Sequence, residues 1–139
     1  MDKQQLIEEL RHRVYVRLKP SPIGGVGVFA IRDIPAGIDP FGEEENDYEA
    51  IPVAEIRDDP EITDAVKKYA EDMCAVDGGF MFVPKNGINR IDPSFFVNHS
   101  AVPNLATPDD GEHFITLREI KTGEELTIDY YTFNDDVRF

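Results

Sequence analysis

Apolar residues recur at helical spacing in two parts of the chain. Near the N-terminus, Leu6, Ile7 and Leu10 share one face of a helix expected over residues 2–12. A longer stripe over residues 60–74 opposes a charged face and predicts a second amphipathic helix packed on the core. The members of that stripe are Ile62, Ala65, Val66, Tyr69, Ala70 and Met73. A single helical turn is expected at 53–57.

Short apolar runs bounded by turn residues predict strands over residues 14–18, 26–31, 80–83 and 125–130. Residues 104–107 and 113–118 flank Asp109-Asp110-Gly111, which favours a hairpin. Gly78-Gly79 is expected to end the second helix, and Asp92-Pro93 to begin a short one. Because the strands are many and short, without regular strand–helix alternation, the pattern predicts a β-rich α+β fold.

Composition narrows the class of protein. The 139 residues fit one domain, and nine Phe with five Tyr suffice for a core. A net charge of −14 argues against contact with nucleic-acid phosphates and favours a basic partner. The single Cys74, expected in the core, permits no internal disulfide and no cysteine-based zinc cluster. With no apolar run of membrane-spanning length and a polar N-terminus, we expect a soluble intracellular protein.

Three segments carry polar or glycine-rich chemistry. GGVGVFA begins at Gly24, and its glycines allow close backbone approach to a ligand or simply form a turn. NHSAVPN begins at Asn98 directly after an apolar segment, so its polar groups require partners in a turn or in a ligand. GEELTIDY ends at Tyr130 and is a turn leading into a strand. Taken singly, each segment is explained by local structure.

Together and in this order, GVGVFA, NHSAVPN and GEELTIDY resemble the SET-domain protein lysine methyltransferases. The resemblance covers residues 14–133 and is to a minimal, single-domain form. It implies a SET fold of short twisted sheets in which the NHS segment and the last strand cross in a knot-like arrangement. The chain then divides into an N-terminal helix (1–13), an N-terminal SET part (14–42), a variable insert (43–90), a C-terminal SET part (91–133) and an acidic tail (134–139).

The resemblance also implies a cofactor, S-adenosyl-L-methionine, and no metal. It assigns catalysis to the hydroxyl of Tyr130. An aromatic residue from the insert usually completes the substrate channel; Tyr48 and Tyr69 are candidates, and the helical stripe places Tyr69 in the core instead. The residues implied to bind the cofactor are Gly25, Val26, Gly27, Asn98, His99 and Phe133.

The acidity has two interpretations. Glu43, Glu44, Glu45, Asp47 and Glu49, with Asp135 and Asp136 in the tail, could attract a basic lysine-containing substrate or form a solvated surface. We interpret Asp109, Asp110, Glu112 and His113 as a turn rather than a metal site, and His12 as an exposed helix residue.

The expected function is transfer of a methyl group to a lysine in a basic protein segment, by a monomer or homodimer. The alternative is a catalytically weak SET-like module that binds a basic protein partner. Two positions depart from the family pattern: Ala101 replaces the Cys that often follows NHS, and Ile128 leaves the degree of methylation open.

Overall fold

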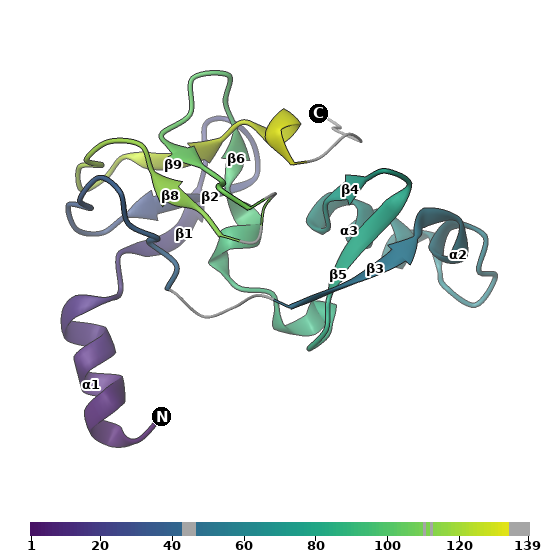
Figure 1. The fold of residues 1–139 in the computed structure, drawn as a ribbon, viewed down its shortest axis with the longest axis horizontal. Coiled ribbons are helices and arrows are strands. Elements are labelled where there is room, and N and C mark those ends of the chain that lie inside the picture. Colours follow the sequence, from purple (N-terminus) through teal and green to yellow (C-terminus); the bar gives the residue numbers. More distant parts are fainter. Residues whose placement is uncertain (43–46, 110, 112, 134–139) are drawn as a thin grey trace.

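The computed structural model describes residues 1–42, 47–109, 111 and 113–133, and its strands form three small sheets (Figure 1). The largest has the order β1 (Val16–Pro20), β2 (Val26–Ala30), β9 (Glu125–Ile128), β6 (Asn98–His99). The second has the order β3 (Tyr48–Pro52), β5 (Phe80–Pro84), β4 (Val76–Asp77), and the third pairs β7 (Leu105–Ala106) with β8 (Ile115–Thr116). The helices are α1 (Lys3–His12), α2 (Val53–Arg57) and α3 (Asp64–Met73), with 3₁₀ turns η1 (Ile88–Arg90), η2 (Pro93–Phe96) and η3 (Tyr130–Thr132). The predicted β-rich α+β class is confirmed.

The four-stranded sheet brings together strands from the first and the last third of the sequence. The last strand, β9, lies between β2, its antiparallel neighbour, and β6, its parallel neighbour. Asn98 is paired with Thr127 and His99 with Ile128, and the Ser100 N–H donates to the Ile128 carbonyl at 3.0 Å. All three sequence motifs therefore lie on adjacent strands of one sheet.

A main core lies beneath this sheet, in what we call the main body (residues 14–42 and 91–133). Its fully buried members include Val28, Ile34 and Leu126, and each such side chain contributes about 1.5–3 kcal/mol through burial. Leu126, Thr127 and Ile128 are all buried, because β9 has strands on both sides and protein on both faces. This explains why the last strand carries a continuous run of buried residues.

A second, smaller core belongs to the insert, the segment from β3 to η1 (residues 48–90), which forms a separate lobe in Figure 1. It contains only Val53, Cys74, Val76 and Met81 among buried residues. The prediction that Cys74 is a core residue is confirmed, since it is 2% exposed.

The glycine pair of the insert has a different role from the one predicted. Gly78 and Gly79 have φ values of 59° and 81° and connect β4 to β5, whereas α3 already ends at Met73. Glycine adopts positive φ without a Cβ clash, so the pair forms the tight turn of a hairpin. The strands β3 and β4 were not predicted.

The helices leave much of their apolar surface exposed. Asp2 caps α1, as its side chain accepts from the Gln5 N–H, but no residue of α1 is buried and Leu10 is 66% exposed. In α3 only the C-terminal residues Ala70 and Met73 pack on the insert core. Tyr69 is 43% exposed, so the prediction that it lies in the core is wrong.

Several other predicted elements are confirmed. The expected helix at residues 2–12, the strand at 26–31 and the hairpin around residues 104–118 correspond to α1, β2 and the β7–β8 pair. The single turn at 53–57 is α2, and the start signal at Asp92-Pro93 begins η2. In the part of the chain that the structure describes, no helix is both long enough and apolar enough to cross a membrane.

Candidate active site

The side chain of Asn98 joins the NHS segment to the glycine segment and to β9. Its Nδ2 donates to the Gly24 carbonyl at 3.4 Å, to the Val26 carbonyl at 3.3 Å and to Glu125 Oε2 at 2.9 Å. One amide thus ties together three strands that come from distant parts of the sequence.

The glycines at positions 24, 25 and 27 differ in why a side chain would or would not be tolerated. Gly25 has a φ of 54°, a conformation that favours glycine. Gly27 has no room for a side chain, because a Cβ there would lie 2.4 Å from Glu125 Oε2 and 2.9 Å from Ser21 Cβ. A Cβ on Gly24 would meet no atom within 4 Å.

Tyr130 begins η3, separated from the end of β9 by one residue, and two hydrogen bonds fix its hydroxyl and its backbone N–H. Its hydroxyl donates to the Val97 carbonyl at 2.5 Å, and its backbone N–H donates to His99 Nδ1 at 3.0 Å. Because Nδ1 accepts this hydrogen bond, the neutral His99 ring carries its proton on Nε2. For the same reason, the 3.8 Å approach of Asp129 Oδ1 to Nδ1 is not an ion pair in this arrangement.

Burial raises the pKa of the Tyr130 phenol above its ordinary value of 10.0, and the negative charge of Glu125 raises it further. The hydroxyl therefore stays protonated at neutral pH and acts as a hydrogen-bond donor. The ring packs edge-on against His99, with ring centroids 5.3 Å apart, and against Phe133, at 6.1 Å. The orientation of the phenol is thus fixed by packing as well as by hydrogen bonds.

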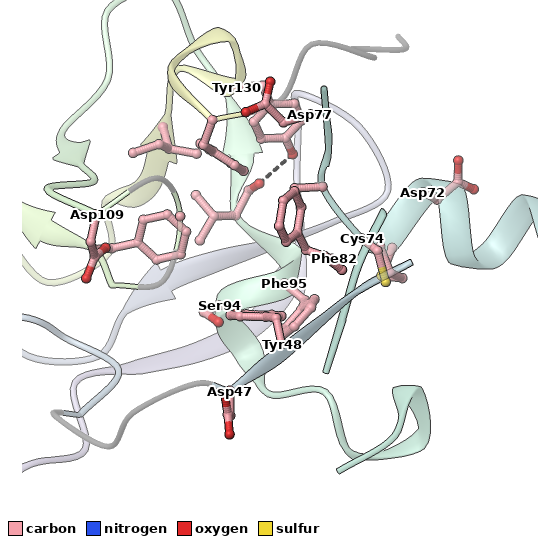
Figure 2. Close-up of a pocket in the computed structure, with 18 residues that line it drawn as sticks. Asp47, Tyr48, Asp72, Cys74, Asp77, Phe82, Ser94, Phe95, Asp109 and Tyr130 are labelled. Carbon is pink, nitrogen blue, oxygen red and sulfur yellow. Dashed lines mark hydrogen bonds between the residues drawn. The ribbon is translucent and has the colours of Figure 1, made fainter. Parts of the chain in front are cut away.

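A cavity of about 380 Å³ lies between the main body and the insert, and Figure 2 shows Tyr130 in its wall. Aromatic rings come from both sides. The main body contributes Phe95, Phe114, Tyr130 and Phe133, and the insert contributes Tyr48 and Phe82. The described lining also includes four carboxylates and no basic side chain; the carboxylates belong to Asp47, Asp72, Asp77 and Asp109.

Three of these four carboxylates already have a cationic or imidazole partner. Asp47 lies 3.7 Å from Lys85 Nζ, Asp72 pairs with Lys68, and Asp109 Oδ2 lies 2.5 Å from His113 Nδ1. Burial alone would raise the pKa of Asp109, but hydrogen bonds to His113 hold it below its usual value. Asp77 forms no ion pair with any residue that the structure describes.

The structure places the predicted site residues in two groups. Tyr130, Phe133 and Tyr48 line the cavity, whereas Asn98 and His99 lie outside its lining. The glycine segment, Gly25, Val26 and Gly27, also lies outside it, next to Asn98. Tyr130 connects the groups, because it contacts His99 on one side and the cavity on the other.

Parts of the predicted acidic surface and the acidic turn lie outside the described residues. These parts are Glu43–Glu45, Asp110, Glu112 and the tail at 134–139. Over the residues that are described, no three His, Cys, Asp or Glu side chains form a group that could hold a metal. His12 is exposed, as predicted.

Sequence reasoning missed several participants. Glu125 belongs to the GEELTIDY motif. Its position as a charged residue at the start of a buried strand could have indicated that it has hydrogen-bond partners inside the protein. Ser21 hydrogen-bonds to Glu125 but lies 104 residues away in the sequence, so nothing local indicated it. Phe82 and Asp77 enter the cavity through a hairpin that was only half predicted.

Comparisons with known proteins identify the family and agree with the fold. The family model of the SET domain matches residues 25–131, and the chain belongs to the SET-domain family. Among solved structures 214 chains match, including the crystal structure of a candidate histone methyltransferase from Plasmodium falciparum. That structure is 18% identical, with a TM-score of 0.50, over 84% of this chain and 92% of the other, so it supports the fold alone. No curated protein matches the chain.

Proposed function

We propose that this protein is an S-adenosylmethionine-dependent protein lysine methyltransferase. One observation carries the proposal: Tyr130 stands between the glycine–Asn98 group and a carboxylate-lined cavity. A transferase needs two binding regions that meet at the reacting atoms, and this arrangement provides them on either side of one hydroxyl.

The residues present fit the cofactor. The amino-acid part of the cofactor carries an ammonium group, and the side-chain carbonyl of Asn98 (Oδ1) offers it an acceptor. This acceptor lies beside Gly24 and Gly25, where a Cβ would meet no atom within 4 Å. His99 would contribute to the remaining contacts, and Phe133, in the cavity wall beside Tyr130, would close the cofactor site from the side that faces the cavity. When bound, S-adenosylmethionine supplies an electrophilic methyl group on a sulfonium, so no metal is required.

The cavity would take the lysine side chain. Lysine must lose a proton before it attacks, and its free pKa is about 10.4. Burial among the rings of Phe95, Tyr48 and Phe82 lowers that pKa, whereas the carboxylates of the wall raise it. Loss of the proton therefore requires the lysine nitrogen to lie among the rings and away from the carboxylates. The neutral Tyr130 hydroxyl, held by Val97, can then orient the amine by a hydrogen bond rather than as a phenolate base.

The substrate class follows from charge. A net charge of −14 and four carboxylates in the cavity wall favour a lysine within a basic protein segment. Histones and other nucleic-acid-binding proteins carry such segments, whereas direct contact with nucleic acid is disfavoured.

The test is transfer of a labelled methyl group from S-adenosylmethionine to basic proteins and lysine peptides, followed by mass spectrometry of the product. We expect label on lysine ε-amines. Cofactor binding without transfer to any substrate would favour the alternative, a SET-like module that binds a basic partner. Absence of both binding and transfer would contradict the proposed function.

A further inference from the structure

The carboxylate of Glu125 holds two segments at once. Its Oε1 and Oε2 accept from the Ser21 hydroxyl at 2.7 and 2.9 Å, and Oε2 also accepts from Asn98 Nδ2 at 2.9 Å. The side chain crosses β2 at Gly27, the position where a Cβ would lie 2.4 Å from Oε2. The Glu125 carboxylate therefore occupies the space that the missing side chain of Gly27 leaves free.

Through Ser21 the same carboxylate fixes the glycine loop. The Ser21 N–H donates to the Gly25 carbonyl at 2.9 Å, and the Ser21 hydroxyl accepts from the Ile23 N–H at 3.1 Å. The loop from 21 to 25 is closed by these two bonds and attached to β9 by Glu125. Loss of the carboxylate would release the loop as well as Asn98.

The contacts of Asn98 also determine which way its amide faces. Three oxygens surround one end of the side chain, and only the NH₂ end can face three acceptors without repulsion. The Oδ1 end accepts no hydrogen bond from any described residue. Within the described part of the chain no buried side-chain oxygen or nitrogen lacks a partner, so Oδ1 must reach solvent. Asn98 thus presents a carbonyl acceptor next to the glycine loop.

From this geometry we infer that Glu125 is a positioning residue for the amino-acid part of the cofactor. It locks Asn98 with Oδ1 outward, as the acceptor for an α-ammonium group, and it holds the glycine loop through Ser21. The inference rests on the proposed function, because it assigns a ligand group to the same site. It predicts selective recognition of the amino-acid part, with little influence on the nucleoside part.

The test compares two ligands by calorimetry: S-adenosylhomocysteine, and 5′-methylthioadenosine, which lacks the amino-acid part. Glu125→Ala should weaken S-adenosylhomocysteine binding about tenfold and change 5′-methylthioadenosine binding little. Glu125→Gln should stay within about threefold of the wild type, since its amide oxygen can accept from Asn98 while its NH₂ donates to Ser21. The control is Glu124→Ala, whose carboxylate pairs with Arg118 instead and should affect neither ligand.

A second readout needs no ligand. In the NMR spectrum, the side-chain NH₂ of Asn98 should give two dispersed signals in the wild type and Glu125→Gln. In Glu125→Ala these signals should move toward the values of a solvated amide.

Three results would overturn the inference: unchanged S-adenosylhomocysteine affinity in Glu125→Ala, equal loss of both ligands, or a Gln variant as weak as the Ala variant. Unperturbed Asn98 signals in Glu125→Ala would also overturn it. A wild-type protein that binds neither ligand would instead contradict the proposed function. The NMR comparison would in that case still show whether Glu125 fixes the side chain of Asn98.

Discussion

The main body and the insert meet at one cavity but are built differently. Among the residues that the structure describes, the main body buries nine apolar residues in a single cluster and the insert only four, and α3 leaves Tyr69 and Val66 exposed. A large core can hold a strand buried on both faces and a fixed polar network beside it. A small core cannot, so we expect the insert to be the less stable region.

The two regions also differ in how their polar groups are used. In the main body, the side chains of Asn98 and Ser21 both donate hydrogen bonds to the Glu125 carboxylate, and these bonds fix the positions of all three side chains. On the insert side of the cavity Asp77 has no ionic partner among the described residues. We interpret this difference as a division of roles, in which the main body binds the cofactor and the insert helps to select the substrate.

The largest expected effect comes from the residue where the two regions meet. Tyr130→Phe removes only the hydroxyl that donates to Val97, so the fold and S-adenosylhomocysteine affinity should be retained. Methyl transfer should fall by about 100-fold or more, as is typical when a positioned catalytic group is lost. Calorimetry and turnover of labelled methyl groups measure the two properties. Full turnover in this variant would contradict the role of Tyr130.

The next effect tests the main body alone. Gly27→Ala places a Cβ against Glu125 and Ser21, so the network around Asn98 must shift and cofactor affinity should fall about tenfold. Glu124→Ala is the control, because its carboxylate pairs with Arg118 outside this network. Equal affinities of the two variants, measured by calorimetry, would show that the close approach at Gly27 is unimportant for binding.

A smaller effect tests the insert. Asp77→Asn should raise KM for a basic lysine peptide severalfold and leave kcat unchanged, because an exposed charge contributes about 1 kcal/mol or less. The difference should shrink at high salt. Asp72→Asn is the control, since Asp72 already pairs with Lys68. Identical KM values for wild type and Asp77→Asn at low salt would remove Asp77 from substrate selection.

The smallest effect concerns Cys74 in the insert core. Burial raises the pKa of its thiol to about 11, so its thiolate fraction at pH 8 should be roughly 100-fold below that of an ordinary cysteine. A disulfide reagent should therefore modify the native protein slowly and the urea-unfolded protein rapidly. Rapid modification of the native protein would show that the insert core opens readily.

The sequence predicted the main body better than the insert, for physical reasons. The run at 26–31 indicated a strand because a buried strand needs consecutive apolar residues, and the hairpin at Gly111 had a clear turn signal. By contrast, β3 is mostly exposed, so Tyr48–Pro52 carries no burial pattern. Tyr69 matched a helical stripe, but a stripe is buried only where a partner surface exists.

The candidate site likewise contains residues that the sequence predicted and residues that it did not. Asn98 and Tyr130 were identified from motifs, whereas Ser21 and Asp77 depend on tertiary contacts that no local pattern encodes. Glu125 was overlooked because a carboxylate next to a turn usually faces solvent. Here it faces inward, since Gly27 leaves space and two donors compensate its charge.

The most direct test is a crystal structure of the protein with S-adenosylhomocysteine and a basic lysine peptide bound together. We predict that the amino-acid part of S-adenosylhomocysteine contacts Asn98 and the glycine loop. We also predict that the lysine side chain enters the cavity between the main body and the insert and ends beside the Tyr130 hydroxyl. A lysine bound outside this cavity, or a nucleoside bound inside it, would contradict the division of roles between the two regions.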